Sequence, residues 1–441
     1  MDISRLAAMP DLDRETVISL RRTYMSPTLQ GFCMSPDDPV VISRGEGPYL
    51  YDTDGKKYLD CTGQNMCISI GAGHPVTKEL IRKQLDRVQH VTTLLFNEMS
   101  AQYAKELVEH LPAGQDWVVQ FVNSGAEALD LAFMMSRAYS GNFDLLYLRD
   151  AYHGLHGVTM GSCGFAVCRQ PAPSAPGFHS VICPNQYRPL LGKGTDQYVE
   201  EIRETIWQNT CGRIAGMVIE PIQGMGGVVP MPEGYMKKAA EVVHAAGGLL
   251  ISDEVQTGFA RTGSHYWGFQ AQDVMPDIIA MGKGIGNGLP IAGVAVRREI
   301  AEAFAGAGLF FNTLACNPLA CASALSVLRV IDAENLQSNA AAMGAYLVGE
   351  MKKLQQRFPV LGDIRGDGLI LGFEFVTDPE TKEPATELCH NILQSLREDG
   401  ILIACVTKRR NIFRINPSLT VGKDDMDHIV FAFENALKKF C

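Results

Sequence analysis

The stretch Leu249-Leu250-Ile251-Ser252-Asp253-Glu254 is an apolar run that ends in two acids. A second apolar run, Pro276-Asp277-Ile278-Ile279-Ala280, is followed by Met281-Gly282-Lys283-Gly284. Short apolar runs bounded by polar or glycine residues are typical of fully buried strands. The exits of parallel strands converge at one edge of a sheet. We therefore predict that Asp253 and Lys283 leave two core strands on the same side of the molecule.

The regions around these runs repeat a strand-then-helix pattern. Trp117–Val122 precedes a helical stretch over Ala126–Tyr139, and Gly216–Ile219 precedes another over Gly234–Ala246. Alternation of this kind is typical of parallel strands joined by crossover helices. The sequence from about residue 60 to residue 330 therefore predicts an α/β fold with a mostly parallel sheet.

The rest of the chain predicts a second, smaller unit, because 441 residues exceed one typical hydrophobic core. Gly47–Asp60 predicts a β-hairpin around Asp54-Gly55, a pair that favours tight turns. In the C-terminal part we expect a long helix near Ala340–Phe358, a glycine-rich strand over Gly366–Phe375 and a terminal helix near Lys423–Lys439. No obvious linker separates the units, so we expect them to share an interface.

Composition narrows the function classes. The net charge of -10 argues against a nucleic-acid partner, because phosphate binding needs a basic surface. No apolar run approaches the length of a membrane span, so we expect no membrane partner. The 12 cysteines form no CxxC pair, and zinc spacings and HExxH are absent. We therefore expect reduced thiols and no metal site.

The first residues, Met1-Asp2-Ile3-Ser4-Arg5-Leu6, mix an acid with a base. They resemble neither a signal peptide nor an acid-poor transit peptide. We expect a cytoplasmic protein, or one of an organelle matrix if a targeting segment has been removed.

An acid and a lysine at neighbouring strand exits are the two groups that pyridoxal phosphate requires. The lysine amine forms a Schiff base with the cofactor aldehyde, and the acid keeps the ring nitrogen protonated so that the ring accepts electrons. Taken singly, Lys283 is more simply a loop lysine and Asp253 a strand-end acid. Polar residues that follow the other predicted strands favour the interpretation that Lys283 and Asp253 bind a cofactor.

Ser124 follows the strand Val118–Val122 and opens a helix in Asn123-Ser124-Gly125-Ala126-Glu127-Ala128. The free N–H groups and positive dipole end of a helix N-terminus suit a phosphate, and Ser124 adds a hydroxyl. The alternative is that Ser124 only caps the helix, with Glu127 completing a capping box.

Two more strands end in polar residues. Tyr152 and His153 follow Leu145–Leu148, and Glu220 follows Met217-Val218-Ile219. Tyr152 suits stacking on a pyridine ring. The alternative is an ordinary core tyrosine beside a satisfied histidine. Because all these residues leave strands at the same predicted edge, their co-location supports one cofactor site more strongly than any single motif.

The chain resembles the class III (subgroup II) pyridoxal-phosphate aminotransferases of fold type I, and within them it is most similar to the alanine–glyoxylate aminotransferase 2 group. The resemblance spans about residues 47 to 417 and rests on motifs in the family's order. They are Asn123-Ser124-Gly125-Ala126-Glu127-Ala128, Tyr152-His153-Gly154, Glu220-Pro221-Ile222-Gln223-Gly224, Asp253-Glu254-Val255-Gln256-Thr257-Gly258-Phe259, Gly282-Lys283-Gly284 and Asn317-Pro318-Leu319-Ala320-Cys321. It implies an N-terminal segment (1–60) packing with the small domain, a large domain (61–330) and a smaller α+β domain (331–441).

The resemblance also implies residue roles. Lys283 is the Schiff-base lysine and proton shuttle, and Asp253 pairs with the ring nitrogen. The implied cofactor-binding residues are Ser124, Gly125, Ala126, Tyr152, His153, Glu220, Asp253, Gln256, Lys283 and Thr313, with Thr313 reaching the other subunit's phosphate in a homodimer. Arg414 matches the arginine that grips a substrate carboxylate, for which a planar fork is suited. The alternative is a surface ion-pair arginine.

Three departures from the family pattern bear on the substrate. Cys316 and Ala315 stand where relatives commonly have glycines after Thr313. Gln64 and Asn65 replace apolar pocket residues, and either bind substrate or face the backbone. Met225 stands where some relatives carry a glutamate that pairs with the arginine matching Arg414.

We therefore expect an aminotransferase that moves an amino group from a primary amine or amino acid to pyruvate or glyoxylate by a ping-pong mechanism. The alternative is a phospho-lyase or other elimination enzyme on the same fold. A non-catalytic binding protein is disfavoured, because Lys283 and Asp253 are both present.

Overall fold

A computed structural model describes residues 3–9, 11–31, 38–165, 168 and 174–441 of the chain. Its largest sheet has seven strands in the spatial order β4-β12-β11-β10-β7-β5-β6. The strands are β4 (Trp117–Val122), β5 (Leu145–Leu148), β6 (Phe178–Val181), β7 (Gly216–Ile219), β10 (Leu249–Asp253), β11 (Ile278–Met281) and β12 (Ala292–Arg297). Only β12 runs antiparallel to its neighbours, so the predicted α/β fold with a mostly parallel sheet is confirmed.

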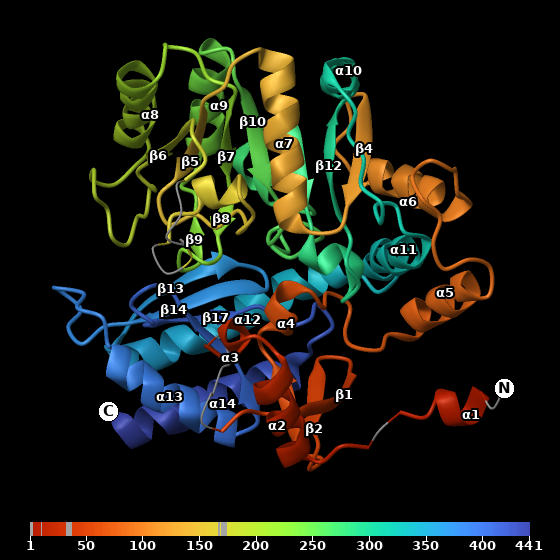
Figure 1. Cartoon of the computed structure of the whole chain (residues 1–441). Coiled ribbons are helices and arrows are strands. Elements are labelled where there is room, and N and C mark those ends of the chain that lie inside the picture. The colour runs from red at the N-terminus through yellow and green to blue at the C-terminus, as the bar shows by residue number, and fades with distance from the viewer. Residues whose placement is uncertain (1–2, 10, 32–37, 166–167, 169–173) are drawn as a thin grey trace.

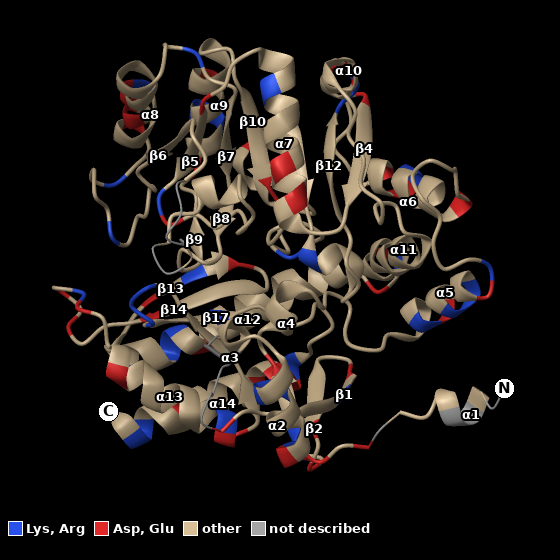
Figure 2. Cartoon of the chain, in the orientation of Figure 1, with Lys and Arg blue, Asp and Glu red and all other residues tan. Residues whose placement is uncertain are grey.

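The central strands β7, β10 and β11 are buried along their whole length, as their uninterrupted apolar runs predicted. Helices pack against this sheet, and α7 crosses in front of it in Figure 1. The helices of this part are α5 (Pro75–Leu85), α6 (Glu98–Glu109), α7 (Gly125–Ser140), α8 (Asp196–Asn209), α9 (Tyr235–Ala245), α10 (Arg298–Ala307) and α11 (Pro318–Ala333). Lys, Arg, Asp and Glu are interspersed on outer helices such as α5 and α6 (Figure 2).

A second sheet lies below the first in Figure 1, with the antiparallel order β13-β14-β17-β16. Its strands are β13 (Leu361–Asp367), β14 (Ile370–Phe375), β16 (Ala404–Val406) and β17 (Ile412–Ile415), and its helices are α12 (Leu336–Arg357), α13 (Thr386–Glu398) and α14 (Lys423–Phe440). The strand expected over Gly366–Phe375 is confirmed over Ile370–Phe375, but its predicted start is wrong. Residues 366 and 367 end β13, and the chain reverses at Gly368, which has φ +53° and leaves no room for a Cβ beside the Thr262 carbonyl.

The N-terminal strands join a segment from near the C-terminus. β1 (Ile42–Glu46), β2 (Tyr49–Asp52) and β3 (Lys57–Asp60) form a meander, and β15 (Ile401–Leu402) pairs with β3 in parallel. The hairpin predicted around Asp54-Gly55 is confirmed, with Gly55 at φ +83°. The division into units at residues 60 and 330 stays a prediction, and α11 continues three residues beyond the second boundary.

The first helices are α1 (Ile3–Leu6), α2 (Arg14–Tyr24) and α3 (Pro27–Gly31). Short elements complete the chain: α4 (Gly63–Met66), β8 (Ile222–Gln223), β9 (Val229–Pro230), and 3₁₀ turns at Thr159–Ser162, Gly268–Gln272 and Lys283–Gly286. Within the described ranges, no helix combines the length and apolar character needed to cross a bilayer.

Candidate active site

Asp253 and Lys283 do leave neighbouring parallel strands at one edge. Asp253 is the last residue of β10 and pairs in register with Ala280 of β11. Lys283 follows β11 with φ +50°, in the left-handed region. The Gly282-Lys283 turn packs closely against the start of α7, since a Cβ on Gly282 would lie only 3.2 Å from the Gly125 Cα. The strand order thus brings the lysine, the acid and a helix N-terminus together.

The Asp253 carboxylate is held from two sides. Its Oδ2 lies 2.7 Å from His153 Nδ1, and its Oδ1 accepts a 3.1 Å hydrogen bond from the Val255 amide. Both the carboxylate and the imidazole are buried. His153 Nε2 has no hydrogen-bond partner among the described residues. The carboxylate therefore has a fixed orientation.

Glu220 connects two loops behind this pair. Its carboxylate accepts hydrogen bonds from the Tyr152 amide at 3.1 Å and the Gly224 amide at 3.2 Å. Burial raises the pKa of Glu220 to about 7, with His153 lowering the pKa and Asp253 raising it. Glu220 thus fixes the start of the Tyr152-His153 turn and the loop that carries Met225.

The Lys283 amine makes no hydrogen bond or ion pair with any residue that the structure describes. Burial lowers its pKa, the Asp253 carboxylate opposes this, and the Arg414 guanidinium lowers the pKa further. A buried amine with a depressed pKa is neutral in a larger fraction of molecules and is therefore a better nucleophile and base.

The N-terminus of α7 lies beside this lysine. Ser124 is the N-cap, and its Oγ accepts a 3.3 Å hydrogen bond from the Glu127 amide. The Glu127 carboxylate accepts from the Asn123 amide at 2.6 Å, so the reciprocal bond of a capping box reaches one residue farther back. Gly125 lies under Val255, since a Cβ there would be 3.1 Å from Val255 Cγ1. Here Ser124 caps the helix, and its phosphate role stays a prediction.

Arg414 is buried in β17, an inner strand of the second sheet, and its described hydrogen-bond contacts are with uncharged groups. Its Nη2 donates to Asn65 Oδ1 at 2.6 Å, and its Nη1 lies 3.5 Å from Gln256 Oε1 and 3.4 Å from Met225 Sδ. Burial lowers the pKa of Arg414 to about 10. Arg414 is therefore not a surface ion-pair residue. It forms no ion pair within the described part of the chain, and the Glu220 carboxylate acts on it only at longer range, raising its pKa against the effect of burial.

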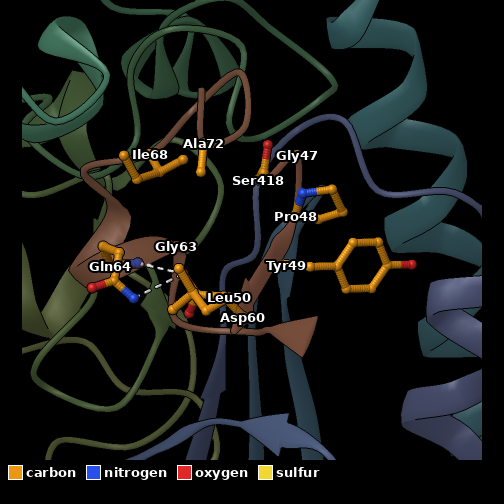
Figure 3. A pocket seen from close by; sticks show the side chains of 10 residues that line it. All are labelled: Gly47, Pro48, Tyr49, Leu50, Asp60, Gly63, Gln64, Ile68, Ala72 and Ser418. Carbon is orange, nitrogen blue, oxygen red and sulfur yellow. Dashed lines mark hydrogen bonds between the residues drawn. The ribbon is translucent and has the colours of Figure 1, made fainter. Parts of the chain in front are cut away.

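Gln64 and Asn65 differ in what they contact. The Gln64 amide group donates to the Asp60 carboxylate at 3.1 Å, and the backbone N–H of Gln64 donates to it at 2.9 Å (Figure 3). Asn65 instead reaches Arg414. Their contact with substrate stays a prediction. The structure nevertheless distinguishes the two residues, because Asn65 binds Arg414 and Gln64 binds the nearby Asp60 carboxylate.

Two residues predicted to bind the cofactor, Tyr152 and Thr313, make none of the polar side-chain contacts described above for the described part of the chain. Tyr152 is half-buried and packs in an apolar cluster that includes Met225 and Phe165. Thr313 is exposed in the loop between α10 and α11, and its neighbour Asn312 accepts a 2.9 Å hydrogen bond from the Asn123 side chain at the start of α7. Its predicted role in another subunit's site is not tested by a single chain.

No group of three or more His, Cys, Asp or Glu side chains is arranged to hold a metal ion in the part of the chain that the structure describes. A family model, aminotransferase class-III, matches residues 33–437. The chain belongs to the class-III aminotransferases. It is therefore a pyridoxal-phosphate-dependent transaminase, which acts on an amine or amino acid donor and an oxo-acid acceptor.

Three known proteins illustrate the similarity of this aminotransferase. Human alanine–glyoxylate aminotransferase 2, mitochondrial, is 37% identical over 96% of this chain and 86% of its own length. An aminotransferase from Bacillus anthracis is 34% identical, with a TM-score of 0.91 over 98% of this chain and all of that one. A phospholyase from Arthrobacter in complex with phosphoethanolamine is 29% identical, with a TM-score of 0.87 over 96% of this chain and all of that one.

The residues of the site fit pyridoxal phosphate. Gly125 and Gly282 leave out the side chains that would fill the space between α7 and the lysine turn. The Lys283 amine has no hydrogen-bond partner among the described residues, and Asp253 is oriented by His153. The sequence predicts these positions but not two of their contacts, those of His153 with Asp253 and of Asn65 with Arg414. Neither has a local signal, because each joins residues at least 100 positions apart.

Proposed function

We propose that this aminotransferase moves an amino group from a primary amine or amino acid to a small 2-oxo acid, pyruvate or glyoxylate, by a ping-pong mechanism. The buried Arg414, which forms no ion pair in the described chain and contacts the neutral Asn65, carries this proposal. A buried charge is costly unless it is paired. A substrate carboxylate supplies that partner, and a 2-oxo acid has one beside its reacting carbon.

The residues around Lys283 have distinct proposed roles. Bound pyridoxal phosphate supplies an electron-withdrawing ring that stabilises negative charge on the substrate carbon. Lys283, with its lowered pKa, takes the proton from the substrate Cα and returns one in the opposite half-reaction. Asp253 holds the proton on the ring nitrogen, and His153 keeps its carboxylate oriented. The N-terminus of α7 binds the phosphate.

The size of the acceptor follows from the surroundings of Arg414. Met225 contacts the guanidinium and is uncharged, so no glutamate at this position conceals the arginine. Arg414 stays available for a short carboxylate. Its described polar neighbours, Asn65 and Gln256, contribute no cation for a second carboxylate.

The test is a donor screen of the cofactor-loaded enzyme with pyruvate or glyoxylate as acceptor. We expect alanine to form from pyruvate, or glycine from glyoxylate, in step with loss of the donor. Because the chain is similar to a phospholyase, phosphoethanolamine must also be tested as a substrate, without any 2-oxo acid present. Release of phosphate and ammonia from it without any 2-oxo acid, and no amino transfer, would replace the transaminase proposal with an elimination enzyme.

A homodimer is supported by exposed apolar side chains in two loops. Leu94, Leu95 and Phe96 lie between α5 and α6, and Leu309 and Leu314 flank Thr313. Large apolar side chains grouped on a surface mark interaction sites. We propose that they pack against a second copy, and sedimentation of the purified enzyme as a monomer would contradict this.

For the compartment we propose an organelle matrix, with the cytoplasm as the alternative. The support is that the human relative is named as mitochondrial. Fractionation of the source cells, with the enzyme followed by antibody, decides between the two.

A further inference from the structure

Asn65 reaches Arg414 from an unusual turn. Four successive residues of α4 have positive φ: Gly63 at +53°, Gln64 at +50°, Asn65 at +60° and Met66 at +67°. The left-handed region is unfavourable for residues with a Cβ, and it occurs mostly as single residues. A run of four persists only where the surroundings hold it, and such strained backbone is concentrated at functional sites.

Asp60 and Asn416 hold this turn in place. The buried Asp60 carboxylate accepts hydrogen bonds from the backbone and side chain of Thr62. It also accepts from the backbone and side chain of Gln64 (Figure 3). A Cβ on Gly63 would lie 2.6 Å from the Asn416 carbonyl oxygen, and the Asn416 amide donates to the Cys61 carbonyl at 2.9 Å. The turn is thus fastened to the segment two residues beyond Arg414.

The result is a guanidinium held by neutral groups. Asn65 supplies an amide oxygen at 2.6 Å, while Gln256 and Met225 are also uncharged. Arg414 Nε has no partner among the described residues. Asn65 itself is exposed, whereas Arg414 is buried, so the amide lies on the open side of the arginine. It orients the cation without neutralising it.

We propose that Asn65 is a positioning residue that keeps the Arg414 guanidinium oriented and accessible in both half-reactions, so that the donor, like the acceptor, must carry a carboxylate beside its reacting carbon. This inference rests on the proposed transaminase function. It narrows the donor class to amino acids, because an amine without a carboxylate would leave the buried cation unpaired.

The test compares alanine with isopropylamine, in which a methyl group replaces the carboxylate, using glyoxylate as the fixed acceptor. We expect wild-type enzyme to prefer alanine by roughly ten- to a hundredfold in kcat/KM, the range for one charge-assisted contact. Asn65→Asp adds a carboxylate of nearly the same shape beside Arg414. It should reduce kcat/KM for alanine by roughly the same factor, mainly through KM, and leave isopropylamine unchanged or improved.

Inhibition by a carboxylate that cannot react distinguishes a loss of carboxylate binding at Arg414 from a loss of the chemical step. Acetate, which carries a carboxylate but cannot react, should inhibit wild-type enzyme, and its inhibition constant should rise in Asn65→Asp as much as the KM for alanine. Asn65→Gly keeps a left-handed backbone and adds no charge, so we expect a smaller loss with alanine. Asn335→Asp is the matched control, because Asn335 is exposed and also left-handed, at φ +52°. It should behave as wild type.

Two results would overturn the inference while the transaminase proposal stands: wild-type enzyme that uses isopropylamine as well as alanine, or Asn65→Asp enzyme that keeps the wild-type preference and acetate inhibition. Absence of amino transfer from every donor to either acceptor would instead overturn the proposed function itself.

Discussion

His153 Nδ1 lies 2.7 Å from Asp253 Oδ2, and both side chains are buried at the exits of different strands. The contact couples the turn that carries Tyr152 to the acid proposed to face the cofactor ring nitrogen. Both residues also lie close enough to Glu220 to affect its pKa. The catalytic roles proposed above therefore depend on one connected set of buried polar groups.

Asp253→Asn should reduce kcat by roughly one to two orders of magnitude, because a neutral amide lacks the charge that holds a proton on the ring nitrogen and a lost charge-assisted contact is worth about 1.5–3 kcal/mol. Cofactor binding should suffer less than turnover. Steady-state kinetics and cofactor absorbance on the same sample check both. Near-normal turnover with the cofactor bound would exclude the role given to Asp253.

Lys283→Ala should lower turnover by at least roughly a hundredfold, the lower end for loss of a positioned acid–base group. The amine has no described partner to lose, so the fold should persist. Borohydride treatment followed by mass spectrometry should attach cofactor to the wild-type chain and not to the variant. Covalent attachment to the variant would mean that another amine is the reactive one.

Pyruvate and glyoxylate should each exceed 2-oxoglutarate as acceptor by about ten- to a hundredfold in kcat/KM with one fixed donor, because the described groups that contact Arg414 are uncharged and supply no second cation for the distal carboxylate. The contact between Met225 and Arg414 motivates this expectation. If 2-oxoglutarate matches the shorter acids, a residue outside this group must bind its distal carboxylate.

The free energy of unfolding should decrease as pH rises from about 4.5 to 7, because the buried Glu220 must then be protonated, or ionised at a cost, in the folded protein. Its pKa in the folded protein is raised to about 7 by burial, above the ordinary value of 4.5, so the unfolded chain releases this proton first. The stabilising contribution is complete below pH 4.5 and lost as pH passes 7. Denaturant unfolding across this range should show a decrease on the order of 1–3 kcal/mol that Glu220→Gln removes.

A matched variant controls for the overall effect of the Glu220→Gln change. Glu302 is exposed on α10, so Glu302→Gln should keep the wild-type pH profile. An identical profile in Glu220→Gln and wild-type enzyme would show that Glu220 is ionised in the folded protein well below pH 7.

Thr313→Ala should weaken cofactor retention, and dilution that dissociates the dimer should do the same. The side chain is exposed in the single chain, which leaves it free to face a second subunit. Cofactor release during dialysis, measured at several protein concentrations, checks this. A monomer that keeps full activity and tightly bound cofactor would contradict both the dimer and the role of Thr313.

Much of the site could be predicted because it lies at strand exits. Asp253, Glu220 and the Tyr152-His153 turn each follow an apolar run, and parallel pairing brings such positions to one edge. The substrate side was less predictable. Gln64 and Asn65 were indistinguishable in sequence, and only the Asp60 carboxylate turns Gln64 aside while Asn65 reaches Arg414.

The sequence by itself determined the α/β fold, the family and the positions of Lys283 and Asp253, because strand period, turn residues and motif spacing are local properties of the chain. The tertiary structure decided which groups surround Arg414. Asn65, Met225 and Gln256 come from three distant segments, and they meet only when the left-handed turn at Gly63–Met66 packs against the end of β17. Hydrogen bonds between segments so far apart depend on packing, for which no local pattern exists.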